Sequence, residues 1–102
     1  MDGVKDLIRP EISPLTDVIP FHYCIKVKKR KAFMNFLLKN KIQTGIHWIP
    51  LHFFKYFEKF SKYSDLKVTQ KIGREIVTLP LHSKMQITKL KYITEVIKKF
   101  SL

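Results

Sequence analysis

The chain has 102 residues, and its 20 Lys and Arg against 8 Asp and Glu give a formal net charge of +12 at pH 7. This length suits one small domain with a single core and does not suit a two-domain enzyme. The hydrophobic content of 45% argues against wholesale disorder, and the single cysteine, Cys24, excludes an internal disulfide and a cysteine-based zinc site.

The N-terminal part of the chain predicts no regular helix. Residues 1–19 contain Pro10 and Pro14 and show no hydrophobic period, so we expect an extended N-terminal segment that packs Leu7 and Ile8 on a neighbour. The stretch has no apolar signal-peptide core, and no apolar run in the chain approaches the roughly 20 residues that span a bilayer. The sequence therefore indicates a soluble protein of a reducing, cytoplasmic compartment with no membrane partner.

A half-buried strand and an amphipathic helix follow. Residues 21–27 alternate in polarity, which predicts a strand whose inner side carries four aromatic or branched residues, Phe21, Tyr23, Ile25 and Val27. Residues 30–40 place Phe33 and Leu37 on one stripe with other apolar side chains, which predicts a helix. Asn40 is the expected left-handed stop residue of this helix.

The middle of the chain alternates short extended and helical stretches. Residues 42–46 predict a short strand, in which Gly45 leaves room for the close approach of another backbone or a ligand. Pro50 prevents a regular helix over residues 47–52, because it biases the preceding residue towards an extended conformation. The aromatic-rich residues 53–60 predict one or two helical turns.

Two helices flank a last short strand. The apolar spacing predicts a helix over residues 66–76, a strand over residues 77–80 that Pro80 ends, and a final helix over residues 86–100. We therefore expect an α+β fold, a small two-layer sandwich of about three short, mostly antiparallel strands with helices packed on one face. The element order suits a split β-α-β arrangement with the third strand between the other two.

The residues with the clearest chemical potential are His47, Trp48 and His52, which follow Gly45 in a loop fixed by Pro50. Two imidazoles that donate or accept hydrogen bonds beside one indole suit polar recognition, with Trp48 stacking on a sugar or a base. The alternative is that these side chains pack structurally and fix the corner of the loop. Two histidines five residues apart also suit a metal, but no third ligand stands close in sequence, so we assign no metal site.

The positive charge leaves a second class of function open. A net charge of +12 is typical of nucleic-acid or anionic-lipid binding, and the aromatic run from Phe53 to Tyr63 suits RNA stacking. However, 17 of the basic residues are Lys and only three are Arg, and the run lacks the spacing of a known RNA-binding motif. We therefore expect a solvated lysine-rich surface and packed aromatics, and we interpret His22, His82 and Cys24 as ordinary surface or half-buried residues.

Two segments resemble one family of enzymes. TGIHWIPLH, at residues 44–52, is similar to the T-G-I-H-Y-x-P-x-H segment in the C-terminal small domain of the DegT/DnrJ/EryC1/StrS sugar aminotransferases, with Trp48 in place of the usual Tyr. VTQKIGREIVTLPLH, at residues 68–82, resembles that family's V-x-E-x-L-x-x-E-I-x-x-L-P-L-H stretch. The resemblance covers about residues 20–100 in register, and Gln86 departs from the Thr or Ser that usually caps the last helix.

The resemblance implies a part of a larger enzyme, in which residues 20–102 form the C-terminal small domain and residues 1–19 precede it. Enzymes of this family are fold-type I proteins that use pyridoxal phosphate (PLP) to transfer an amino group to a keto-sugar nucleotide in surface-polysaccharide or amino-sugar biosynthesis. Their Schiff-base lysine, the acid that pairs with the pyridine nitrogen and the phosphate site lie in a large domain that nothing in this sequence matches. We therefore expect this chain to bind no PLP and to be inactive alone.

The resemblance also implies site residues and partners. It places His47, Trp48 and His52 near the mouth of a cleft between two domains as substrate-binding residues, and it assigns no catalytic, cofactor-binding or metal-binding residue to this chain. The expected partner is a large PLP-binding domain or subunit; a homo-oligomer is also open, and nucleic acid is not expected. The alternatives are a basic binding module for RNA or anionic surfaces and a gene remnant without function.

Overall fold

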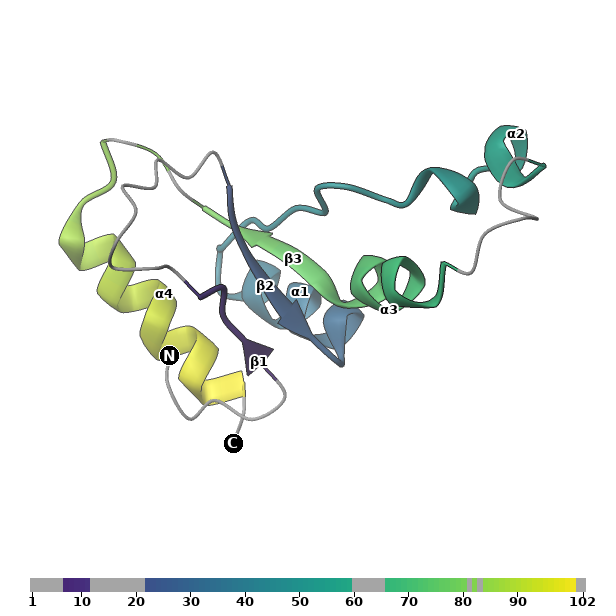
Figure 1. The fold of residues 1–102 in the computed structure, drawn as a ribbon. Coiled ribbons are helices and arrows are strands. Elements are labelled where there is room, and N and C mark those ends of the chain that lie inside the picture. Colours follow the sequence, from purple (N-terminus) through teal and green to yellow (C-terminus); the bar gives the residue numbers. More distant parts are fainter. Residues whose placement is uncertain (1–6, 12–21, 60–65, 81, 83, 101–102) are drawn as a thin grey trace.

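The computed structural model describes residues 7–11, 22–59, 66–80, 82 and 84–100, and these ranges form one three-stranded sheet with helices around it (Figure 1). The elements are, in chain order, β1 (Leu7–Ile8), β2 (Tyr23–Val27), α1 (Arg30–Lys39), the 3-10 helix η1 (Leu51–Phe53), α2 (Lys55–Glu58), α3 (Lys67–Glu75), β3 (Ile76–Leu79) and α4 (Ile87–Phe100). None of these helices is long and apolar enough to cross a membrane.

The central strand of the sheet is β2, which pairs antiparallel with β1 on one side and with β3 on the other. In this register Leu7 lies opposite Val27, and Cys24 lies opposite Thr78. The strand β3 follows α3 without a loop, because Glu75 ends the helix and Ile76 begins the strand. The prediction of a small, mostly antiparallel α+β sandwich is confirmed.

The strand expected over residues 42–46 is wrong, because only Gly45 pairs with β3. The backbone N–H of Gly45 donates to the carbonyl of Thr78 at 3.1 Å, and the N–H of Thr78 donates back to the carbonyl of Gly45 at 2.8 Å. Ile42, at the start of the expected strand, instead closes the end of α1 and is 4% exposed. The last strand, β3, is thus an edge strand of the three-stranded sheet, with the single bridge of Gly45 on its outer side, and it does not lie between two other strands as the split arrangement predicted.

Leu7 and Ile8 form an edge strand where the sequence predicted only an extended segment. Leu7 packs against the core as expected, whereas Ile8 is 55% exposed. A strand of two residues carries no periodic signal, and it forms because β2 offers an unpaired edge. The predicted boundary between residues 19 and 20 lies outside the described residues.

The core lies between one face of the sheet and the helices α1 and α4, with α1 behind the sheet in the view of Figure 1. Alternation along β2 and β3 directs every second side chain to this face. The buried members come from both strands, both helices and the turn after α1: Ile25, Val27, Phe33, Leu37, Ile42, Val77, Leu79, Val96 and Ile97. The predicted inner side of β2 is thus confirmed at Ile25 and Val27, while Phe21 lies outside the described residues.

The helix α1 ends in a Schellman motif, one residue later than the sequence analysis expected. The N–H of Lys41 donates to the carbonyl of Leu38, and the N–H of Ile42 donates to the carbonyl of Leu37, which are the two bonds of this motif. Lys41, at φ 64°, is therefore the left-handed residue, and Asn40 is not, with φ at −93°. The side chain of Asn40 instead donates to the carbonyl of Phe36 at 2.9 Å, so it satisfies another group of the last turn.

Arg30, in the first turn of α1, ties that helix to the end of α3. Its Nη1 donates to the carbonyl of Gly73 and, at 3.4 Å, to the carbonyl of Ile76. These carbonyls lie at the C-terminus of α3, where the helix leaves acceptors without intrahelical donors and where a positive charge is favourable.

We expect the substitution Arg30→Met to lower the free energy of unfolding by about 1.5–3 kcal/mol, because the two carbonyls lose a charged donor. Lys31→Met removes the same charge from the next, exposed position of α1 and is expected to change stability by less than about 0.5 kcal/mol. Urea unfolding followed by circular dichroism measures both. Equal losses in the two variants would contradict the role of Arg30 at the end of α3.

Candidate functional site

The candidate site lies on the face of the sheet opposite the core. Because side chains alternate along a strand, Cys24 of β2 and Thr78 of β3 point away from the helices when Ile25 and Val77 point towards them. His47 follows the Gly45 bridge and covers Thr78, which is only 7% exposed. The sheet register therefore brings residues from three separate segments to one place.

A row of three polar side chains forms the base of the site. His47 Nδ1 and Thr78 Oγ1 are 2.9 Å apart, and Thr78 Oγ1 and Cys24 Sγ are 3.4 Å apart. The hydroxyl of Thr78 thus joins an imidazole on one side and a thiol on the other. Cys24 is a free cysteine of intermediate exposure.

A cluster of three aromatic rings lies above this row, and we call it the ring cluster: His22, His47 and Trp48. The two imidazoles stack with centroids 4.2 Å apart and planes 11° from parallel. The indole of Trp48 lies edge-on to both, at 4.9 Å from His47 and 6.2 Å from His22. Trp48 is 72% exposed, so its large flat ring is available to a ligand, while His47 supplies a hydrogen-bonding group next to it.

Gly45 lets the ring of His47 lie close to the backbone. A Cβ at position 45 would lie 2.9 Å from Cε1 of His47 and 3.4 Å from its Nδ1. The absence of a side chain therefore permits the position of the imidazole over Thr78. The close approach expected at Gly45 is present, and the group that a Cβ would displace is the ring of His47.

His52 lies apart from the ring cluster, in η1. Its ring contacts Phe53, with centroids 4.8 Å apart, and its Nε2 is buried without a hydrogen-bond partner among the described residues. No hydrogen bond or ring contact joins it to His47 or Trp48 in the described part of the chain. The structure therefore brings together two of the three predicted site residues.

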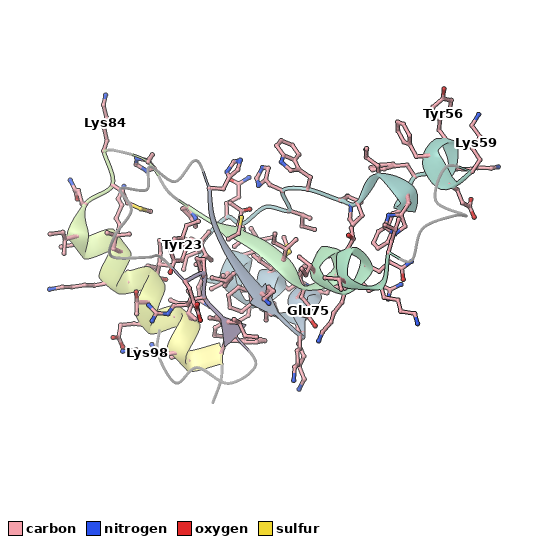
Figure 2. The ribbon with its side chains drawn as sticks, viewed as in Figure 1. Tyr23, Tyr56, Lys59, Glu75, Lys84 and Lys98 are labelled. Carbon is pink, nitrogen blue, oxygen red and sulfur yellow. The ribbon has the colours of Figure 1, made fainter. Side chains whose placement is uncertain are left out.

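The segment from Trp48 to Lys59 extends away from the sheet as an arm that ends in α2, and we call it the aromatic arm (Figure 1). Figure 2 shows Tyr56 and Lys59 at its far end. Its large apolar side chains are exposed, namely Trp48, Ile49, Leu51, Phe53, Phe54, Tyr56 and Phe57. We expected this aromatic run to pack against a sheet or a neighbouring domain, and the described residues of the run do not pack on the sheet.

The aromatic arm is attached to α3 at two points. Pro50 lies so close to Gly73 that a Cβ there would approach its Cγ to 2.3 Å and its Cδ to 2.7 Å. The guanidinium of Arg74 lies 5.8 Å from the ring centroid of Phe53, within the range of a cation–π contact. Gly73, which is buried in α3, thus lets Pro50 of the aromatic arm pack against this helix.

We expect Gly73→Ala to displace Pro50 and to lower the free energy of unfolding, although alanine is the better helix former. The gain in helix propensity is about 1 kcal/mol, while overpacking against a rigid proline ring costs about 1–3 kcal/mol. Thr69→Ala, at an exposed position of the same helix, is the control and should stabilise slightly. Amide chemical shifts of residues 48–53 report the displacement, and a more stable Gly73→Ala variant with unchanged shifts would contradict the docking.

A groove of about 510 Å³ between α3 and the edge of the sheet shares no residue with the ring cluster. It is lined by Lys26, Lys28 and Lys71 together with Glu75 and by apolar side chains of β1 and α3. No group of three or more His, Cys, Asp and Glu that could hold a metal ion is found within the described ranges. The ring cluster is therefore the better candidate, because its hydrogen-bonding groups are held by buried partners.

The chain matches known proteins over almost its whole length. The sequence profile of the DegT/DnrJ/EryC1/StrS aminotransferase family matches residues 3–98. The dTDP-3-amino-3,6-dideoxy-alpha-D-galactopyranose transaminase of Aneurinibacillus thermoaerophilus is 29% identical over 79 residues, which are 76% of this chain and 22% of that protein.

Solved structures share the fold. DesV of S. venezuelae, crystallised with a ketimine intermediate, superposes with a TM-score of 0.89 at 16% identity, over 98% of this chain and 28% of that one. The sugar aminotransferase CalS13 of Micromonospora echinospora gives a TM-score of 0.84 at 20% identity, over 96% and 26% of the two chains. The chain thus spans about a quarter of the length of the relatives that it matches.

Proposed function

Because the chain belongs to the DegT/DnrJ/EryC1/StrS aminotransferase family, we propose that it forms the C-terminal small domain of a sugar aminotransferase. The observation that carries this proposal is the family match over residues 3–98, in a chain that spans about a quarter of the relatives' length. The reaction proposed for the whole enzyme is amino transfer to a keto-sugar nucleotide. The chain contributes to it by binding substrate and by completing the cleft.

The ring cluster is the part of this domain that we assign to the substrate. The exposed indole of Trp48 offers an apolar face on which a sugar or a base stacks. Next to it, His47 is fixed by Thr78 and by the stack with His22, so it presents one ring nitrogen in a defined direction. We keep His52 as a third substrate-binding candidate, since its buried Nε2 has no protein partner among the described residues.

PLP, when bound by enzymes of this family, supplies the electron sink for amino transfer. It needs a lysine amine, a carboxylate for its pyridine nitrogen and an anion site, commonly a helix N-terminus. The contacts of His47 are Thr78, His22 and Trp48, which include neither an amine nor a carboxylate. The helices α1 and α3 begin after Lys29 and Leu66, and neither start is rich in the Gly, Ser and Thr residues that commonly hold a phosphate. The ring cluster therefore does not fit PLP, and we assign the cofactor to a large domain.

The aromatic arm is the surface that we assign to that large domain or to a second protomer. Seven of the ten residues from Trp48 to Phe57 are exposed large apolar residues, and they lie on elements that contact each other and α3. Apolar surface of this kind usually marks an interface. Covering it would also exclude water from the side of the cleft that Trp48 borders.

A domain graft tests the proposal. The small domain of the A. thermoaerophilus transaminase is replaced by this chain, and the glutamate-dependent amino transfer of the graft is measured with that enzyme's substrate. We expect transfer by the graft and a loss of about tenfold or more in kcat/KM on Trp48→Ala, since stacking of one ring contributes about 1–3 kcal/mol. A folded graft that binds PLP but transfers no amino group would contradict the proposal.

The graft needs a control for the loss of an exposed aromatic ring. Tyr56→Ala removes a ring of similar exposure from the far end of the aromatic arm, 68% against 72% for Trp48. It is expected to leave KM for the sugar nucleotide unchanged, whatever it does to domain association. Equal rises in KM for both variants would assign the effect to the arm as a whole and not to the ring cluster.

A further inference from the structure

The hydroxyl of Thr78 has to serve two neighbours with a single hydrogen. It lies 2.9 Å from Nδ1 of His47 and 3.4 Å from Sγ of Cys24, and Thr78 is 7% exposed. A hydroxyl donates once and accepts up to twice, a thiol is a weak donor and acceptor, and a neutral imidazole carries hydrogen on one nitrogen only. If Thr78 accepted from both neighbours, its own hydrogen would have no acceptor in the row, which is unfavourable for a hydroxyl on a residue that is 7% exposed. Two arrangements use that hydrogen within the row. Either Thr78 donates to His47 and accepts from Cys24, or it accepts from His47 and donates to Cys24.

Acceptor strength decides between these arrangements. The lone pair of a neutral imidazole is far more basic than that of a hydroxyl, and sulfur is a weak acceptor. The first arrangement gives the hydroxyl hydrogen to the best acceptor in the row, while the second gives it to the poorest. The two distances from Oγ1 of Thr78 fit the first arrangement. The 2.9 Å to Nδ1 of His47 is a normal hydrogen-bond distance, whereas the 3.4 Å to Sγ of Cys24 is a weak contact.

We propose that Thr78 is the positioning residue of the site and that its hydroxyl holds neutral His47 in the tautomer with hydrogen on Nε2. The ring cannot easily turn away, because His22 stacks on its face and Gly45 lies against its edge. The Nε2 of His47 makes no hydrogen bond to any described residue and is not one of the buried polar atoms left without a partner. His47 then offers an N–H to an acceptor oxygen of the ligand, and this last step depends on the proposed function.

The tautomer is measured by long-range 1H–15N NMR correlation on the whole chain, without ligand, at a pH well above the ordinary histidine pKa of about 6.5. Loss of one signal set in His47→Asn assigns the ring. We expect the Nε2–H pattern in the wild-type chain and in Thr78→Ser, which keeps the hydroxyl. Thr78→Val is isosteric but lacks the hydroxyl, so we expect its His47 signals to move to the averaged pattern of two exchanging tautomers.

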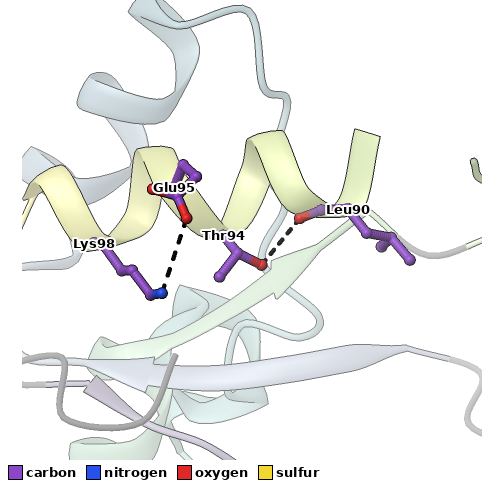
Figure 3. A network of polar contacts seen from close by, with 4 residues as sticks. All are labelled: Leu90, Thr94, Glu95 and Lys98. Carbon is purple, nitrogen blue, oxygen red and sulfur yellow. Dashed lines mark hydrogen bonds and ion pairs between the residues drawn. The ribbon is translucent and has the colours of Figure 1, made fainter. Parts of the chain in front are cut away.

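Two further variants separate this role from a general structural effect. Thr94→Val removes the hydroxyl that donates to the carbonyl of Leu90 in α4, at 2.9 Å (Figure 3), and should leave the His47 signals unchanged. Cys24→Ala removes the thiol and should retain the Nε2–H pattern, because Thr78 still donates to His47. An Nδ1–H pattern in the wild-type chain, or an unchanged pattern in folded Thr78→Val, overturns the proposal.

If Thr78→Val does not fold, the wild-type spectrum and Cys24→Ala still decide the question. The arrangement in which Thr78 accepts from His47 predicts hydrogen on Nδ1 in the wild-type chain. The result is also independent of the domain graft. If the graft is inactive and His47 carries its hydrogen on Nε2, the proposed function is rejected and the role of Thr78 stands. If the graft is active and His47 carries its hydrogen on Nδ1, the proposed function is supported and the role of Thr78 is rejected.

Discussion

Replacing Leu37 with alanine is expected to lower the free energy of unfolding by about 2–5 kcal/mol, while the same replacement at the next residue, Leu38, should cost less than about 0.5 kcal/mol. Leu37 is fully buried in the core, and Leu38 is 63% exposed on the solvent-facing side of α1. Both changes remove the same atoms from the same helix, so they differ only in packing. Urea unfolding followed by circular dichroism measures the difference.

The expected loss at Leu37 is large because its side chain fills the centre of the core and its truncation leaves a cavity there. The backbone carbonyl of Leu37, which accepts the hydrogen bond of Ile42 in the Schellman motif, is present in both variants. A domain of this size has a total stability of about 5–15 kcal/mol, so the Leu37 variant approaches the limit of folding. Equal losses in both variants would contradict the orientation of α1 against the sheet.

The elements with a repeated pattern were predictable from sequence to within about two residues. The strand over 21–27, the helices over 30–40 and 86–100, and the strand over 77–80 bury residues on one face, and burial imposes the period that the sequence shows. The helix over 66–76 also forms, but its apolar residues Val68 and Ile72 are 73% and 37% exposed. The helical turns expected over residues 53–60 are also present as α2, although residue 60 lies outside the described residues.

The errors fall where pairing or capping decides the structure. No local pattern shows that Leu7 and Ile8 pair with β2, since that depends on an edge provided more than fifteen residues later. The apolar character of Ile42 suggested a strand, but its burial comes from closing α1. Asn40 is the usual left-handed residue by type, yet the number of residues in the last turn places Lys41 in that conformation.

The candidate site was predictable only in part for the same reason. His47 and Trp48 are neighbours in sequence, so their proximity needs no knowledge of the fold. Thr78 and His22 join them through the pairing of β2, β3 and Gly45, which the sequence pattern does not fix. The alternation over residues 21–27 does place His22 on the same face as Cys24, and this is the signal from which His22 could have been identified.

The chain alone is expected to show no stoichiometric PLP binding and no amino transfer from glutamate to a keto-sugar nucleotide. A lysine that bonds to the cofactor must be neutral and desolvated, because a protonated amine is not a nucleophile. Every described lysine is exposed except Lys26, which is half-buried on β2. Borohydride reduction after incubation with one equivalent of PLP, followed by peptide mapping, should therefore give low labelling spread over many of the 17 lysines.

Lys26 provides the sharpest form of this test, because it is the one described lysine that is not exposed. It lies opposite Ile76 in the sheet and lines the groove beside α3, where Lys28 and Lys71 also lie. These ammonium groups attract the phosphate of free PLP without fixing its ring, so labelling there should fall as salt screens the charges. Two results together would overturn the assignment of PLP to a large domain. The first is complete labelling of a single lysine that does not fall with salt. The second is amino transfer by this chain that is abolished when the labelled lysine, Lys26 or another, is replaced by arginine.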